Sequence, residues 1–292
     1  MTSRTQIMGI VNVTPDSFSD GGQFATTEAA VSQARALVSQ GADIVDIGGE
    51  STRPGATPVP RAEELARILP VVRDLAALGH SISIDTLHAE TARAAVAAGA
   101  RLINDVSGGL HDPDMVAVAA EASRTHGARY LIGHWRGVPD PAQQRSNYGD
   151  VVAEVRDVLG ARADAAVAAG VDPTHIVVDP GLGFDKTGEQ GWQLLAHLES
   201  LRSLGYPVLV GASRKRMIAE ALTRGRGTGA STAASIAARD VATAVTSALA
   251  AGAGAWGVRV HDVETTVLAL AVAEAWEEGR QGPAPETRKA QR

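Results

Sequence analysis

Polar and charged side chains recur in this sequence at the ends of short apolar runs. They are Asn12, Asp46, Asp85, Asn104, Asp105, His134, Asp179, Ser213, Arg214, Lys215, Arg259 and His261. Asp, Asn and Ser are common helix caps, so any one of these residues could simply start the helix that follows. Polar ends on all eight runs are hard to explain by capping alone, and they predict a polar site where the runs end.

The acidic and amide members of this set could bind a flat polar ring. Asp85 and Asp179 offer carboxylate acceptors, and an amide such as Asn12 offers both a donor and an acceptor. Such groups around the rim of a cavity match the edge of a nitrogen heterocycle. The sequence therefore predicts a pocket for a ring with hydrogen-bonding edges.

The cationic members could bind an anion. Arg214 and Lys215 end the seventh apolar run, while Arg259 and His261 end the eighth. If the runs are the strands of an eight-stranded barrel, strands 7 and 8 are the ones that commonly bind phosphate. The alternative for Arg214 and Lys215 is a solvated basic loop. Because Asn12 is a single amide ligand with no acidic cluster of its own, a Mg²⁺ ion here would arrive on substrate phosphates.

Eight apolar runs must position these side chains. They cover 7–13, 43–49, 81–86, 102–106, 130–135, 176–181, 208–213 and 255–261. Each has the length of a strand, and continuous apolar character is typical of parallel strands that are buried on both faces.

Longer Ala-rich amphipathic stretches alternate with these runs. They cover 26–41, 61–79, 89–100, 113–122, 150–170, 191–205, 231–252 and 261–279, with long loops expected at 58–61 and 223–232. Eight strands each followed by a helix predict an α/β protein, a (β/α)8 TIM barrel formed as a single domain over residues 1–280. Residues 281–292 are expected to form a flexible tail. An open doubly wound sheet is the rival, and an even count of eight without a second domain favours closure.

Alternation along each strand sharpens the site. The residues that share an inward face near the strand ends are Asn12, Asp85, Asp179, Arg259 and His261. Asn104 and Asp105 are neighbours, so only one of them points inward, and parity does not choose between the two.

Composition excludes several classes of protein. A net charge of −6 and a pI near 5.8 argue against nucleic-acid binding or an anionic membrane surface. The chain has no cysteine, so it has neither disulfides nor thiolate metal sites. No apolar run is long enough to span a bilayer. A cytoplasmic protein is expected.

Seven motifs, in order, carry a resemblance to a known family. They are MGIVNVTPDSFSDGG, GGESTRPGA, SIDT, INDVSGG, VDPGLGF, GASRKR and GVRVHDV, within residues 6 to 275. Together they resemble the dihydropteroate synthase family of pterin-binding TIM barrels. The resemblance implies a transferase that joins 4-aminobenzoate to 6-hydroxymethyl-7,8-dihydropterin diphosphate and releases pyrophosphate in folate biosynthesis. It also implies Mg²⁺, a homodimer and inhibition by sulfonamides.

The resemblance also implies a role for each matching residue. Pterin would be bound by Asp85, Asn104, Asp179 and Lys215, which favours Asn104 over Asp105; diphosphate by Thr52, Arg259 and His261; and Mg²⁺ by Asn12. Aminobenzoate would meet Phe18, Ser19, Arg53, Pro54, Phe184, Ser213 and Arg214. Asp85, Asp179, Lys215 and Arg259 would be the catalytic residues. The two phenylalanines could instead be hydrophobic anchors of their loops.

One position departs from the family pattern. A bulky Met often precedes the strand-5 His, and here that position is Gly133. The pocket could be wider there, or Ile132 or Trp135 could fill the space. His134 could face the mouth or be a structural histidine.

The implied mechanism is an SN1-like loss of pyrophosphate without a covalent enzyme intermediate, with the leaving group stabilised by cations. The rivals are a methyltetrahydrofolate-binding methyltransferase and a silent paralogue. The first would not need the SRK and RVH segments. The second should have lost Asn12, Arg53 or Lys215, and all three are present.

Overall fold

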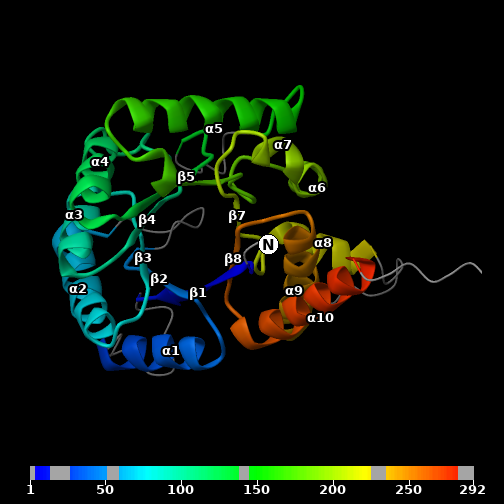
Figure 1. Ribbon diagram of the computed structural model, residues 1–292, viewed down its shortest axis with the longest axis horizontal. Coiled ribbons are helices and arrows are strands. Elements are labelled where there is room, and N and C mark those ends of the chain that lie inside the picture. The colour runs from blue at the N-terminus through cyan, green and yellow to red at the C-terminus, as the bar shows by residue number, and fades with distance from the viewer. Residues whose placement is uncertain (1–3, 14–26, 51–58, 138–144, 225–234, 282–292) are drawn as a thin grey trace, which may run out of the picture.

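A computed structural model describes residues 4–13, 27–50, 59–137, 145–224 and 235–281. Eight parallel strands alternate with helices along the chain (Figure 1). The strands are β1 Gln6–Asn12, β2 Ile44–Gly48, β3 Ile82–Asp85, β4 Leu102–Asp105, β5 Arg129–Gly133, β6 Ile176–Asp179, β7 Leu209–Val210 and β8 Gly257–Val260. They pair in the order β6-β5-β4-β3-β2-β1-β8-β7.

A single bridge closes this sheet into a barrel. Val178 of β6 pairs in parallel with Val208, and the Val178 amide donates to the Pro207 carbonyl at 2.9 Å. Closure removes both sheet edges, so the predicted barrel is confirmed and the open doubly wound sheet is excluded.

Helices surround the barrel (Figure 1). They are α1 Thr27–Ser39, α2 Arg61–Ala77, α3 Ala89–Ala98, α4 Met115–His126, α5 Val151–Ala168, α6 Gly188–Ala196, α7 Leu198–Arg202, α8 Arg216–Arg224, α9 Ile236–Gly252 and α10 Val263–Gln281, with a 3₁₀ turn at Pro173–His175. None of the helices in the described part of the chain is both long and apolar enough to cross a membrane.

Two helical expectations need correction. The stretch 191–205 forms two helices, because the chain leaves helical geometry at His197 (φ −117°, ψ 39°). The first of them, α6, starts earlier than predicted because Thr187 and Gln190 form a capping box. The helix α8 was not predicted; it buries Met217 and Ile218 and ends where the expected loop begins. The remainder of that loop, and residues 282–292 of the expected tail, lie outside the described residues.

The apolar core has two parts. The outer part lies between strands and helices, and the inner part lies inside the barrel. The inner part consists of Met8, Ile44, Leu102, Leu131, Val177 and Leu209, with Trp256 packed against it. Since strand residues alternate, the inward residues two positions further along are polar or glycine on five of these strands, among them Asp46, Asn104 and Asp179, whereas β1 has Ile10 there.

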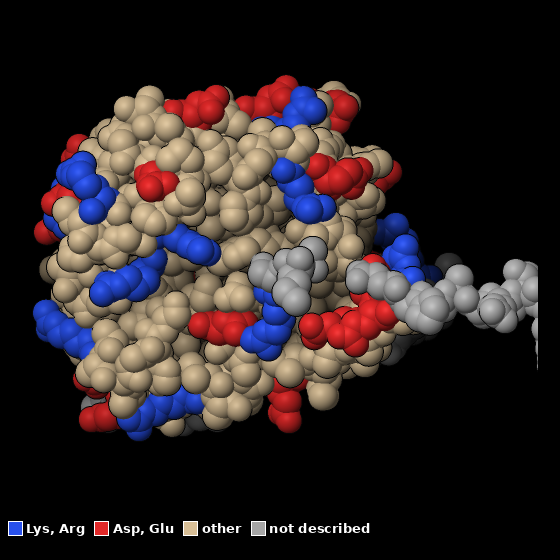
Figure 2. Space-filling view, in the orientation of Figure 1, with Lys and Arg blue, Asp and Glu red and all other residues tan. Residues whose placement is uncertain are grey.

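Charged residues are mixed in sign on one face of the molecule. Figure 2 shows Lys and Arg side chains interspersed with Asp and Glu on the visible face, without a large area of one sign. The visible face therefore has no basic surface of the kind that binds nucleic acid.

Candidate active site

The guanidinium of Arg259 lies among carboxylates at the centre of the mouth. Its Nε donates to Asp46 Oδ2 at 2.6 Å, and its Nη2 donates to Asp85 Oδ2 at 2.5 Å. Asp46 is fully buried and Asp85 nearly so. The three side chains come from β8, β2 and β3, which parallel packing brings to one end of the barrel.

Burial and charge set the ionisation of this group. Burial raises the pKa of Asp85 to about 7, with Arg259 opposing the shift. Burial alone would lower the pKa of Arg259, but Asp46 and Asp85 raise it above its ordinary value. Arg259 is therefore a permanent cation, while Asp85 changes charge near neutral pH.

Asn104, and not Asp105, points into the barrel. The Asn104 amide Nδ2 donates to Asp46 Oδ2 at 3.1 Å. Asp105 faces the helices, where it accepts hydrogen bonds from Ser107 and from the Tyr130 hydroxyl at 2.9 Å. The choice that parity had left open is thereby settled in favour of Asn104.

Asp179 and Lys215 form a second cluster across the mouth. Asp179 Oδ1 accepts from the Gly181 amide at 2.7 Å, while Lys215 Nζ donates to the Leu182 carbonyl and lies 5.3 Å from the ring centre of Phe184. Burial lowers the pKa of Lys215 to about 8, and Asp179 opposes that shift. An ammonium beside an aromatic face and a carboxylate can orient a planar ring.

Gly211 leaves space beside Asp179 and Lys215. A Cβ atom on Gly211 would stand 3.6 Å from Asp179 Oδ2 and 3.9 Å from Lys215 Nζ. Any larger side chain at that inward position would enter the space between the strand ends. The absence of a side chain there leaves room for a ligand beside the acid and the amine.

The predicted diphosphate and aminobenzoate residues after β7 and β8 are partly tied to one another. Ser213 Oγ lies 2.8 Å from His261 Nδ1 and accepts from the His261 backbone amide at 3.1 Å. Arg214, at a positive φ of 58°, forms a two-bond ion pair with Asp240 of α9, at 2.6 and 2.8 Å. The Arg214 side chain therefore braces α9, and the contact with aminobenzoate stays a prediction.

Asn12 ends β1 at the rim, half-buried. A Cβ atom on its register partner Gly48 would lie 3.8 Å from Asn12 Oδ1 and 3.7 Å from the Asp85 Cβ, so the amide oxygen stands near the acid cluster. No group of three His, Cys, Asp or Glu side chains that could hold a metal occurs among the described residues. One neutral oxygen at the rim fits a Mg²⁺ ion whose other ligands are substrate phosphates and water.

The predicted contacts on two loops lie outside the described residues. These contacts are Phe18, Ser19, Thr52, Arg53 and Pro54. Their roles in binding aminobenzoate and diphosphate stay predictions.

Comparison with known proteins identifies the arrangement. The sequence model of the pterin binding enzyme family matches residues 8–261. This chain belongs to the pterin binding enzyme family.

Relatives named dihydropteroate synthase match nearly the whole of this chain in sequence and in fold. The dihydropteroate synthase of Mycobacterium leprae is 52% identical over 272 residues, covering 93% of each chain. The dihydropteroate synthase of Xanthomonas albilineans, solved with 4-aminobenzoic acid, is 44% identical, with a TM-score of 0.83 and coverage of 97% of this chain and 95% of that one. The same enzyme has been solved with 7,8-dihydropteroate. The Yersinia pestis dihydropteroate synthase in a sulfonamide complex is 38% identical, with a TM-score of 0.84 and coverage of 95% and 96%.

Gly133 is dictated by packing within this pterin binding enzyme. A Cβ atom there would stand 2.5 to 2.7 Å from the backbone of Val106, much closer than a real contact. The space is filled by that backbone, since Ile132 packs in the outer core and Trp135 is buried beside His111. The Val106 backbone, and neither of these side chains, therefore stands where a side chain of residue 133 would begin, and the wider pocket stays a prediction.

His134 is a structural histidine. It is buried, and its Nδ1 lies 3.0 Å from Nζ of the buried Lys186, which also donates to the carbonyls of Gly181 and Phe184. Burial lowers the pKa of His134 to about 2, with Lys186 adding to the shift, so the ring is neutral. Burial lowers the pKa of Lys186 to about 7. The pair ties the loop that carries Phe184 to the end of β5.

Two contributors to the site escaped sequence reasoning. The sequence motifs assign no role to Asp46, although its position two residues after the inward Ile44 places it inside the barrel. Lys186 lies in a loop, where no periodic pattern points to a partner such as His134.

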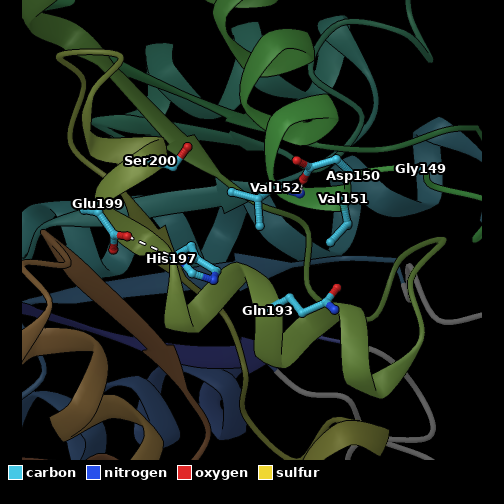
Figure 3. A pocket seen from close by; sticks show the side chains of 8 residues that line it. All are labelled: Gly149, Asp150, Val151, Val152, Gln193, His197, Glu199 and Ser200. Carbon is cyan, nitrogen blue, oxygen red and sulfur yellow. Dashed lines mark hydrogen bonds and ion pairs between the residues drawn. The ribbon is translucent and has the colours of Figure 1, made fainter.

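A hollow of about 520 Å³ lies outside this site. It is lined by Gly149, Asp150, Val151, Val152, Gln193, His197, Glu199 and Ser200, between the start of α5 and the α6–α7 segment (Figure 3). His197 and Glu199 form an exposed pair at 3.5 Å, and no strand-end residue lines the hollow. Its acidic, exposed wall offers no catalytic arrangement, so the mouth of the barrel is the candidate active site.

Proposed function

We propose that this protein is a dihydropteroate synthase. It condenses 6-hydroxymethyl-7,8-dihydropterin diphosphate with 4-aminobenzoate, giving 7,8-dihydropteroate and pyrophosphate in folate biosynthesis. The observation that carries the proposal is the inward group of Asp85, Asn104, Asp179, Lys215 and Arg259 at one mouth, in a chain so similar to enzymes of that name.

The pterin is held by its polar edge. Asp85 and Asp179 accept hydrogen bonds from ring N–H groups. The Asn104 amide and the Lys215 ammonium form hydrogen bonds with the remaining atoms of the ring edge. Phe184 stands beside Lys215 at the loop end of the pocket. Charged acceptors in a buried pocket discriminate strongly against rings that lack the matching donors.

The diphosphate lies toward Arg259 and His261 at the rim. Asn12 would supply one oxygen ligand to a Mg²⁺ ion bound with the substrate, and that ion would supply positive charge beside the diphosphate. Arg259 keeps its positive charge throughout, because the neighbouring carboxylates of Asp46 and Asp85 raise the pKa of its guanidinium. The cationic rim therefore favours departure of an anionic leaving group.

The chain's own residues favour a dissociative, SN1-like reaction. The carboxylates of Asp85 and Asp179 stabilise positive charge that develops on the pterin when its bond to the diphosphate oxygen breaks. The aromatic amine then attacks the methylene carbon and releases its proton. No described side chain at the mouth is placed as a nucleophile, so we expect no covalent enzyme intermediate.

A pyrophosphate-release assay tests this function. With both substrates and Mg²⁺ we expect pyrophosphate and 7,8-dihydropteroate in equal amounts, and little release without 4-aminobenzoate or without Mg²⁺. Methyl transfer from methyltetrahydrofolate in place of this reaction would support the methyltransferase alternative. Binding of pterin without turnover would support the silent paralogue.

We also infer a homodimer. Apolar side chains that are more than half exposed follow one face of α9 and one face of α10, which pack against each other (Figure 1). They are Ile236, Val241, Val245 and Leu249 on α9, and Leu268, Val272 and Trp276 on α10. Exposed apolar side chains that gather on two packed helices are typical of a protein interface, and a second copy of the chain is the partner we propose.

Sulfonamides are the inhibitors that we expect, because they resemble 4-aminobenzoate and the Yersinia pestis relative has been solved with one. We place the enzyme in the cytoplasm, a reducing compartment with which a sequence without cysteine is compatible.

A further inference from the structure

Asp46 is a buried carboxylate beneath the proposed substrate site. It is fully buried, and its register partners are Ile10 on β1 and Ser83 on β3. It lies inside the barrel, two residues before Gly48, the register partner of Asp85. An ionised group at such a depth is costly unless it is paired and hydrogen-bonded.

Two donors from opposite parts of the site converge on one oxygen of Asp46. The Oδ2 atom accepts from Arg259 Nε at 2.6 Å and from Asn104 Nδ2 at 3.1 Å. In the proposed reaction, Arg259 serves the diphosphate and Asn104 serves the pterin edge. Neither donor can move far without loss of its bond to the shared oxygen, so Asp46 links the geometry of the two subsites.

The second hydrogen bond of Arg259 goes to a residue that the proposed substrate also contacts. Its Nη2 donates to Asp85, a carboxylate that the pterin edge also needs. Asp85 Oδ1 has no hydrogen-bond partner among the described residues, so a ring can use that oxygen, while Asp46 gives the guanidinium an anchor that the ring does not contact. The second oxygen of Asp46 has no hydrogen-bond partner among the described residues. The hydrogen bonds from Arg259 and Asn104 to the first oxygen therefore offset the cost of burying this carboxylate.

We propose that Asp46 is a positioning residue for the condensation. Through one carboxylate oxygen it orients the Arg259 guanidinium toward the diphosphate and the Asn104 amide toward the pterin. This inference rests on the proposed function, but its binding consequences are measurable without turnover.

The test uses Asp46→Asn, which keeps the size of the side chain and removes its charge. The matched control is Asp105→Asn, a buried acid on β4 whose partners face the helices. Calorimetry would measure the Kd of pyrophosphate with Mg²⁺ and, separately, the Kd of 6-hydroxymethylpterin. Loss of a charged hydrogen bond predicts that both are weakened by about ten- to a hundredfold in Asp46→Asn. In Asp105→Asn we expect a lower Tm with both Kd values within about twofold of the wild type.

A folded Asp46→Asn protein with both affinities unchanged would overturn the proposal, as would equal losses in the two variants. If Asp46→Asn does not fold, the Arg259 Nε–H signal in the wild-type ¹H–¹⁵N spectrum, assigned with Arg259→Lys, decides. Slow exchange of the Nε proton with solvent supports its hydrogen bond to Asp46, and fast exchange refutes that bond.

The two hypotheses fail differently. A wild type that binds both ligands but releases no pyrophosphate refutes the dihydropteroate synthase function, and the binding comparison still decides the role of Asp46. A wild type that binds neither ligand refutes both, because there are then no subsites to link.

Discussion

At the scale of single residues, Asp85 gives the site a pH dependence. Because its pKa rises from 3.8 to about 7 on folding, the folded protein keeps a proton that the unfolded chain loses. Stability from this group therefore falls as pH rises from about 4 to about 7. Ring N–H donors bind the ionised form better, so the affinity for 6-hydroxymethylpterin should rise from pH 6 to pH 8. Calorimetry across this range checks the prediction. Asp85→Asn should bind weakly with a flat profile, and the same slope in that variant would contradict the assignment.

At the scale of elements, alternation predicted most of the architecture. Eight apolar runs became eight strands, and the parity of β3 and β6 placed Asp85 and Asp179 inside. Side-chain contacts between distant strands could not be predicted in this way. The convergence of Asn104 and Arg259 on Asp46 depends on strand register around a closed barrel, which no local pattern encodes. The break between α6 and α7 was missed because a turn within an apolar helical pattern leaves the periodicity almost unchanged.

Close packing of β4 on β5 yields a prediction at the same scale. Gly133→Ala would bring a methyl group within 2.7 Å of the Val106 backbone, just beyond the strand that carries Asn104. We expect a loss of about 1–3 kcal/mol in the free energy of unfolding, together with weaker pterin binding. Gly252→Ala at the end of α9 is the matched control, because a Cβ there meets nothing within 4 Å. It should be neutral or slightly stabilising. Equal Tm values for both variants and the wild type in thermal unfolding would show that β4 and β5 tolerate the methyl group.

At the scale of the whole molecule, the exposed apolar faces of α9 and α10 predict the state of assembly. Sedimentation should give about twice the 30.1 kDa mass of one chain at micromolar concentration. Leu249→Asp, at a position 69% exposed, places a charge in the proposed interface and should yield folded monomers. Leu78→Asp is the control, since Leu78 is also exposed but follows α2, away from those helices, and the dimer should persist. Because Arg214 braces α9 through Asp240, monomers should also lose some activity. A wild type that sediments as a single chain would contradict the proposed dimer.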